Sequence, residues 1–168
     1  MRRLLCLSLL ALSVHSFGQS SFVVRPALGN PELTDGSGRE KSSVAVGEVM
    51  RFTVPVYNNS FEQSVRAGSG RLEVDLGAVG AGVLEVVQAP LRGSFLWDKA
   101  VIRNGHSYIS GRLVNNLGGS YAGSETFVLK ATGPLSTRLR VRWIDTTPAA
   151  GKRPDIFTEL QVKVSESR

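Results

Sequence analysis

The residues best suited to chemistry in this sequence are three arginines in the stretch STRLRVRWID. Arg138, Arg140 and Arg142 alternate there with apolar residues. In a β-strand, this alternation places the three guanidinium groups in a row on one face and the apolar side chains on the other. Three like charges at that spacing repel one another unless something compensates them.

Two interpretations of the arginine row remain open. In the first, the arginines pair across the sheet with carboxylates of a neighbouring strand. The candidate carboxylates are Glu73, Asp75 and Glu159. In the second, the row is an open patch that binds an anionic ligand, such as an acidic polysaccharide or a lipid headgroup. We expect the pairing, because the alternation first builds a sheet.

Two carboxylates stand next to each other on one strand face. Glu73 and Asp75 alternate with apolar residues in RLEVDL, which places them about 6–7 Å apart on the strand. A glycosidase needs only two acids beside a cleft, so this spacing is compatible with catalysis. Acids that alternate along the outward face of a strand are normally solvated, and we expect Glu73 and Asp75 to be solvated surface residues.

The histidine and cysteine content disfavours the commonest catalytic and metal sites. Cys6 is the only cysteine of the sequence, and His15 and His106 are its two histidines. A serine triad requires a histidine base, and a catalytic zinc site usually takes two or three histidines. His106 follows the dipeptide Asn104-Gly105, where we expect an exposed turn residue. We therefore expect no catalytic residue, no metal site and no cofactor.

One loop has an alternative interpretation as a calcium site. The stretch TDGSGRE offers oxygen ligands from Asp35, Ser37 and Glu40. Calcium loops usually carry two or three acids at alternate positions. This loop has fewer acids in that pattern, so a plain turn is the expected structure.

Aromatic residues supply a second kind of candidate site, because exposed rings stack on sugars. Trp143 lies on the apolar side of the arginine strand and is expected in the core. Trp97 shares a strand face with Phe95, opposite Leu96, so one of these two faces is partly exposed. Core burial and a surface platform both stay open for Trp97. The candidate ligand-binding residues are Arg138, Arg140, Arg142, Trp97 and Tyr108.

The pattern that positions these residues is that of an all-β protein. Apolar and polar residues alternate in short runs that recur about every ten residues, with 18 glycines in the chain and no long helical pattern. This predicts an antiparallel two-sheet sandwich of eight or nine strands. Asn104-Gly105 predicts a type I′ hairpin turn. Pro55 lies inside an apolar run, which predicts an edge strand or a bulge.

Three stretches carry a resemblance to a known class of domains. In order along the chain, VGEVMRFTVPVYNN, GRLEVDLGAVGAGVLEVV and SETFVLKATG resemble motifs of bacterial extracellular Ig-like modules. They are similar to cohesin-like modules and to the conserved-repeat domains of bacterial surface proteins, over roughly residues 44–145. The resemblance implies an Ig-like, cohesin-like β-sandwich that binds or spaces partners at the cell surface.

The N-terminus predicts export. Arg2 and Arg3 precede an apolar stretch over residues 4–14, and Ser16 and Gly18 provide the small residues that a signal peptidase accepts. We expect a secretory signal peptide over residues 1–18 and one β-sandwich domain over residues 19–168. The apolar stretch is too short for a comfortable membrane span, and no later segment reaches spanning length.

The expected export determines the composition of the mature chain and the class of partner that we expect. Removal of Arg2 and Arg3 lowers the formal net charge from +6 by two, to +4, and Cys6 is removed as well. A disulfide-free exported chain of this kind is typical of bacteria, so we expect it in the periplasm, at the cell surface or secreted. We expect a non-enzymatic structural or protein-interaction module whose partner is another extracellular or surface protein. The alternative is a carbohydrate-binding module. Nucleic acid is disfavoured, because export separates the chain from it and no aromatics interleave the arginines.

Overall fold

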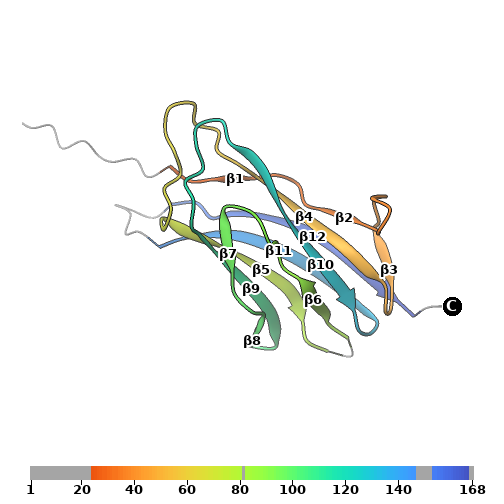
Figure 1. Ribbon diagram of the computed structural model, residues 1–168. Coiled ribbons are helices and arrows are strands. Elements are labelled where there is room, and N and C mark those ends of the chain that lie inside the picture. Colours follow the sequence, from red (N-terminus) through yellow and green to blue (C-terminus); the bar gives the residue numbers. More distant parts are fainter. Residues whose placement is uncertain (1–23, 81, 147–152, 167–168) are drawn as a thin grey trace, which may run out of the picture.

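The computed structural model describes residues 24–80, 82–146 and 153–166, which form twelve strands and no helix (Figure 1). The five-stranded sheet contains β1 (Ala27–Leu28), β2 (Glu32–Thr34), β4 (Val49–Tyr57), β6 (Leu84–Gln88) and β10 (Ala122–Ala131). The seven-stranded sheet contains β3 (Ser43–Ala45), β5 (Gly70–Ala78), β7 (Phe95–Trp97), β8 (Val101–Arg103), β9 (His106–Leu113), β11 (Leu135–Asp145) and β12 (Ile156–Ser165). The predicted signal peptide, residues 1–18, lies outside the described residues.

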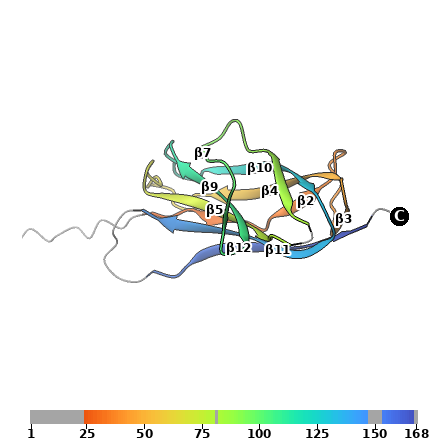
Figure 2. The same ribbon diagram turned by 90° about the horizontal axis from the view of Figure 1, so that it is seen from below.

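The two sheets pack face to face, so the predicted all-β sandwich is confirmed (Figure 2). The predicted count of eight or nine strands is wrong, because the described residues contain twelve. The additional strands are two or three residues long, which is too short for alternation to reveal. The sheets are also not wholly antiparallel, since β3 runs parallel to β12.

Alternation along the long strands builds the core between the sheets. In β4 and β10 every second side chain is fully buried, and the rings of Phe52 and Phe127 meet with centroids 6.2 Å apart. In β11 the buried members are Leu139, Val141 and Trp143. Because side chains alternate across a strand, burial of these three places the arginines between them on the outer face of the seven-stranded sheet.

The hairpin between β8 and β9 has the predicted turn chemistry. Asn104 and Gly105 both adopt positive φ, at 50° and 76°, and Arg103 pairs with His106 across the turn. Positive φ at both central residues is the condition for a type I′ turn. This hairpin brings Arg103 and His106 to the edge of the arginine-bearing face.

Pro55 differs from its prediction. It lies in β4, which is a central strand flanked by β10 on one side and by β1 and β2 on the other. A proline is tolerated here because the neighbouring strand is interrupted between Leu28 and Glu32, opposite Pro55. Gly29 in that interruption donates its N–H to the Pro55 carbonyl at 3.0 Å. The nitrogen of Pro55, which carries no hydrogen, therefore faces a break in the neighbouring strand and leaves no ladder hydrogen bond unmade.

Candidate functional site

The outer face of the seven-stranded sheet collects most of the predicted site residues, and we call it the arginine face. Its central rows follow from the strand register. Arg142 lies between Phe157 on β12 and Glu73 on β5, and Arg140 lies between Glu159 and Asp75 on the same two strands. Beyond β5, the next strand is β9, where Tyr108 pairs with Asp75.

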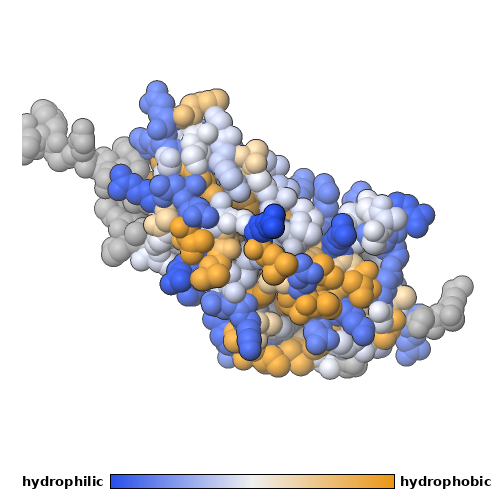
Figure 3. All heavy atoms as spheres, viewed as in Figure 1, coloured by the Kyte–Doolittle hydropathy of each residue, from blue (hydrophilic) through white to orange (hydrophobic). Residues whose placement is uncertain are grey.

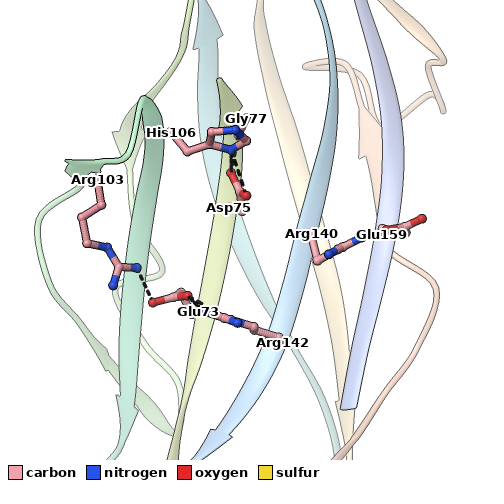
Figure 4. A network of polar contacts seen from close by, with 8 residues as sticks. All are labelled: Glu73, Asp75, Gly77, Arg103, His106, Arg140, Arg142 and Glu159. Atoms are coloured by element: carbon pink, nitrogen blue, oxygen red, sulfur yellow. Dashed lines mark hydrogen bonds and ion pairs between the residues drawn. The ribbon is translucent and has the colours of Figure 1, made fainter. Parts of the chain in front are cut away.

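Glu73 is the centre of this face. Arg142 donates to its Oε1 from Nη2 at 2.6 Å and from Nε at 3.0 Å, and Arg103 donates to its Oε2 at 2.5 Å (Figure 4). The Glu73 side chain is 1% exposed, whereas Arg142 and Arg103 are 53% and 47% exposed. Burial alone would raise the pKa of Glu73, but the hydrogen bonds from Arg142 and Arg103 hold it below its ordinary value.

The prediction that Glu73 is a solvated residue is wrong. Alternation correctly placed it on the outer face, but the guanidinium groups of Arg142 on the adjacent strand β11 and of Arg103 on β8, beyond β9, cover it from both sides. Arg103 reaches Glu73 by passing over the ring of Tyr108, with its guanidinium carbon 4.4 Å from the ring centroid. The carboxylate is thereby buried although the described strands form only two sheets and none of them packs on this outer face.

The remaining arginines of the row pair with Glu159. Arg138 Nη1 lies 3.0 Å from Glu159 Oε1, and Arg140 Nη2 lies 3.0 Å from Glu159 Oε2. Figure 4 shows Arg140 directed toward Glu159 and Arg142 toward Glu73, in opposite directions. The expected cross-strand pairing of the row is therefore present, with Glu73 and Glu159 as its carboxylates. Each carboxylate serves two arginines, so each cluster keeps one excess positive charge.

Asp75 has a different environment, because Arg140 turns away from it. His106 Nδ1 lies 3.0 and 3.1 Å from the two carboxylate oxygens of Asp75, and Gly77 donates its N–H to Asp75 at 2.8 Å. His106 was expected to be a simple exposed turn residue. Its side chain is 42% exposed and is hydrogen-bonded to Asp75, because β9 pairs with β5 and His106 lies opposite Ala78.

A shallow concavity of about 220 Å³ opens between these clusters. The residues that line it are Glu73, Asp75, Tyr108, Arg140, Arg142, Asp155 and Phe157. Phe157 was not among the predicted site residues. It is 54% exposed, and its ring centroid lies 5.3 Å from the Arg140 guanidinium carbon. The alternation FTELQVKV contained the signal, because it places Phe157 on the same face as Glu159.

Trp97 does not join this face. Its ring meets Phe127 of the opposite sheet edge-on, with centroids 4.6 Å apart, and it lies across Gly111 on the inner side of β9. Its indole N–H donates to Glu125 at 3.0 Å. Trp97 is partly buried and packs against the core, so the structure favours packing over the surface platform. Trp97 and Tyr108 lie on opposite faces of the same sheet.

Glu125 is a second buried carboxylate, 2% exposed, between the sheets. Burial raises the pKa of Glu125 above its ordinary value, although hydrogen bonds from the Trp97 side chain and the Ser94 backbone act in the opposite direction. A side-chain carbon added at Gly93 would lie 2.7 Å from its Oε1. Glu125 is therefore enclosed by Gly93, Ser94 and Trp97 and is not exposed at the surface.

The loop with the calcium alternative closes on itself. Asp35 accepts hydrogen bonds from the Ser37 N–H at 2.8 Å, the Ser37 hydroxyl at 2.6 Å and the Arg39 N–H at 3.1 Å. The hydrogen bond from the Ser37 hydroxyl is the largest of the effects that lower the pKa of Asp35. Within the described ranges, no three histidine, cysteine or acidic residues group as metal ligands do.

The opposite side of the sandwich, formed by the five-stranded sheet, also exposes apolar side chains. Figure 3 shows the molecule from the direction of Figure 1, where apolar side chains gather over β6 and β10 between polar ones. Val87 on β6 is exposed there. Among the described residues there is no helix that is long and apolar enough to cross a membrane.

Comparison with known proteins finds no family for this chain. No family model matches the sequence, and no curated protein matches it. A cohesin module of a family 33 glycoside hydrolase from Clostridium perfringens is 14% identical, with 84% of this chain and 99% of that one covered and a TM-score of 0.48. A CARDB domain from Pyrococcus furiosus is 15% identical, with 83% and 94% covered and a TM-score of 0.46.

A third solved structure belongs to a longer protein fragment. The C-terminal domain of an antigen I/II-family protein of Streptococcus pyogenes is 11% identical, with 82% of this chain but 46% of that one covered and a TM-score of 0.46. These likenesses concern the β-sandwich fold alone. A cohesin module, one of the two classes that the sequence resembles, is among these solved structures.

We expect the Glu73→Gln substitution to lower the free energy of unfolding by about 2 kcal/mol at pH 7, because it removes a buried carboxylate that accepts three charge-assisted hydrogen bonds. A folded-state pKa below the ordinary value of 4.5 means that this stabilisation is present above pH 4.5 and lost as pH falls through the folded pKa. Urea titrations at pH 7, 5 and 4 should therefore show a penalty that shrinks toward low pH. Glu159→Gln, at a more exposed pair, should cost less than about 1 kcal/mol. Equal penalties at all three pH values would contradict the electrostatic role of Glu73.

Proposed function

We propose that this chain is an exported, non-catalytic β-sandwich module that binds another extracellular protein through the arginine face. The single observation that supports this most strongly is the composition of that face. Arginine and aromatic side chains that stand half exposed on a rigid sheet are typical of the residues that dominate protein-binding interfaces. The residues concerned are Arg103, Arg138, Arg140, Arg142, Tyr108 and Phe157.

Charge complementarity favours an acidic partner. Among the described residues, seven cations occupy outward positions on the face, against four carboxylates, which is an excess of three positive charges. The cations are Arg71, Arg103, Arg112, Arg138, Arg140, Arg142 and Lys163, and the carboxylates are Glu73, Asp75, Asp155 and Glu159. A face with excess positive charge accelerates the encounter with an acidic surface and disfavours a basic one.

The carboxylates support a non-catalytic role. Both oxygens of Glu73 are occupied by arginines, and its lowered pKa makes it a poor general acid at neutral pH. Asp75 is held by His106 and by the Gly77 N–H. An enzymatic activity, on glycan, ester or peptide panels, that is lost in Glu73→Gln or Asp75→Asn would overturn this part of the proposal.

A carbohydrate-binding module is the second candidate, and one observation favours it. Tyr108 and Phe157 both line the concavity of about 220 Å³, together with charged groups that can hydrogen-bond sugar hydroxyls. A glycan array on the exported chain tests this candidate directly. Glycan binding that Phe157→Ala abolishes, in a chain that still unfolds cooperatively, would place sugar binding ahead of protein binding.

Two matched double variants test the protein-binding proposal. Arg112→Glu with Lys163→Glu reverses two exposed cations of the arginine face. Arg51→Glu with Lys130→Glu makes the same charge change on the outer face of the other sheet. Both double variants lower the net charge by four, so effects of overall charge are equal in them.

The measurement uses a partner isolated by cross-linking in the producing cells, purified and titrated against each form. We expect the arginine-face variant to bind at least ten-fold more weakly, while the control stays within two-fold of the parent. Equal loss in both variants, or loss in the control alone, would overturn the assignment of the binding face. A chain that captures no exported protein but retains glycans would overturn protein binding itself.

A further inference from the structure

The last strand of the seven-stranded sheet, β12, has one edge beside the arginine face that no described strand pairs along most of its length, although β1 of the other sheet lies near β12. We call this unpaired part the open edge. β12 pairs with β11 along its length, from Ile156 to Val164. On its other side, the strand among the described residues that pairs with it is β3, and the register covers only Lys163–Ser165. The stretch Phe157–Gln161 therefore lies at the edge of the sheet, beyond the end of β3.

The register shows which backbone groups face this edge. Val46, just after β3, donates its N–H to the Ser165 carbonyl at 3.0 Å, so Ser165 directs its backbone groups away from β11. Backbone hydrogen-bonding direction alternates along a strand paired in regular antiparallel register. Phe157, Glu159 and Gln161 therefore present their N–H and C=O groups to the open edge, whereas Thr158 and Leu160 bond to β11.

The same three residues direct their side chains to the arginine face. Their neighbours Val162 and Val164 are buried, so the odd-numbered positions of β12 point outward. Two arginines converge on Glu159, 3.0 Å from each of its oxygens, which leaves one excess positive charge beside the edge, and Lys163 adds a second. A strand added here would place alternate side chains next to that excess charge.

We propose that the arginine face binds its partner by strand addition, with an extended acidic segment pairing to the β12 edge over Phe157–Gln161. Main-chain hydrogen bonds supply the register, and the arginine clusters select acidic side chains at alternate positions of the added strand. This inference rests on the proposed function and specifies its mode of binding.

A proline substitution at the edge isolates the main-chain contribution. Gln161→Pro removes an N–H that faces the edge and leaves the bonds to β11 intact, which is the position where a strand tolerates proline. Gln161→Ala removes the same side chain and keeps the N–H. Thermal unfolding of the exported chain should show that both variants remain folded.

The probe is a fluorescein-labelled decapeptide of alternating threonine and glutamate, with a threonine–lysine decapeptide as the charge control. We expect the acidic peptide to bind the parent at least ten-fold more tightly than the basic one, and to bind more weakly at about 0.5 M salt, where charges are screened within ~4 Å. Gln161→Pro should weaken binding at least ten-fold and Gln161→Ala less than two-fold. Amide exchange at Phe157, Glu159 and Gln161 should slow when the acidic peptide is bound.

Three outcomes would overturn the inference. If Gln161→Pro binds the acidic peptide as tightly as the parent, the edge is not the site, although the arginine face still is. If the parent binds neither peptide, or binds both equally, an acidic extended segment is not what the edge selects. Heparin binding without peptide binding identifies a polysaccharide ligand instead. Failure of the proposed function can be distinguished from failure of this inference. In the first case the purified partner binds the Arg112→Glu, Lys163→Glu double variant as tightly as the parent.

Discussion

Substituting Gly77 with alanine should lower the free energy of unfolding by about 4 kcal/mol, as the combined cost of backbone strain and overpacking. Gly77 adopts φ +98°, and a Cβ at this position would lie 1.8 Å from the hydroxyl oxygen of Thr137 on the adjacent strand β11. The pairing of β5 with β9 shifts register between Asp75 and Ala78, so this glycine sits at an irregularity of the sheet. Chemical denaturation followed by tryptophan fluorescence measures the loss.

Two further variants separate the causes of that loss. Gly105→Ala meets the same kind of backbone strain, at φ +76°, but no atom lies within 4 Å of the added carbon, so it should cost only about 1 kcal/mol. Adding Thr137→Ala to Gly77→Ala removes the closest atom and should recover part of the difference. A Gly77→Ala protein as stable as Gly105→Ala would show that β5 and β11 do not approach each other this closely.

The fold follows from the sequence where the pattern is long or chemically distinctive. Alternation of β4, β10 and β11 predicts the buried faces, and Asn104-Gly105 predicts the turn, because each is a local requirement of the backbone. The short strands β1, β2 and β3 are set by their long partners and carry no period of their own. Pro55 shows the same limit, because its tolerance depends on a break in another strand that lies over twenty residues away.

The arginine face divides in a similar way. The sequence predicts the arginine row, the face of each acid and three candidate partners for the row, because alternation determines faces. It does not predict that Glu73 and Glu159 pair with the arginines whereas Asp75 pairs with His106. It does not predict that Glu73 is buried, since the cover comes from Arg103 on a third strand. The register of neighbouring strands and the distance that a side chain spans across them depend on the tertiary structure, so alternation within one strand does not reveal them. Trp97 is the corresponding case in the core, because its face is readable in FLW but its contacts with Phe127 and Glu125 are not.

Trp97→Ala should destabilise the protein by about 4 kcal/mol, in the range for removing a packed aromatic side chain. The substitution removes the edge-on contact with Phe127 and the contact with Phe95, whose ring centroid is 6.0 Å away. It also removes the N–H that Glu125 accepts at 3.0 Å. Because Trp97 lies in the core, glycan binding should change in this variant only as far as folding does. Lost glycan binding with an unchanged unfolding midpoint would instead restore Trp97 as a binding platform.

Trp97→Phe isolates the hydrogen bond to Glu125 and gives it a pH signature. The bond favours the charged carboxylate, so its removal should raise a pKa that burial already holds above the ordinary value of 4.5. A raised folded-state pKa means that stability is lost as pH rises from the unfolded pKa to the folded pKa, because in that range the folded protein retains a proton that the unfolded chain releases.

The penalty of Trp97→Phe should therefore grow between pH 4 and pH 7, toward about 1–3 kcal/mol for an unpaired buried acceptor. The penalty of Glu73→Gln also grows with rising pH, but for a different reason. The charged form of Glu73 is stabilised in the folded protein, whereas the charged form of Glu125 is destabilised there. Combining Trp97→Phe with Glu125→Gln separates the two, because the pH dependence should vanish there and persist in Glu73→Gln.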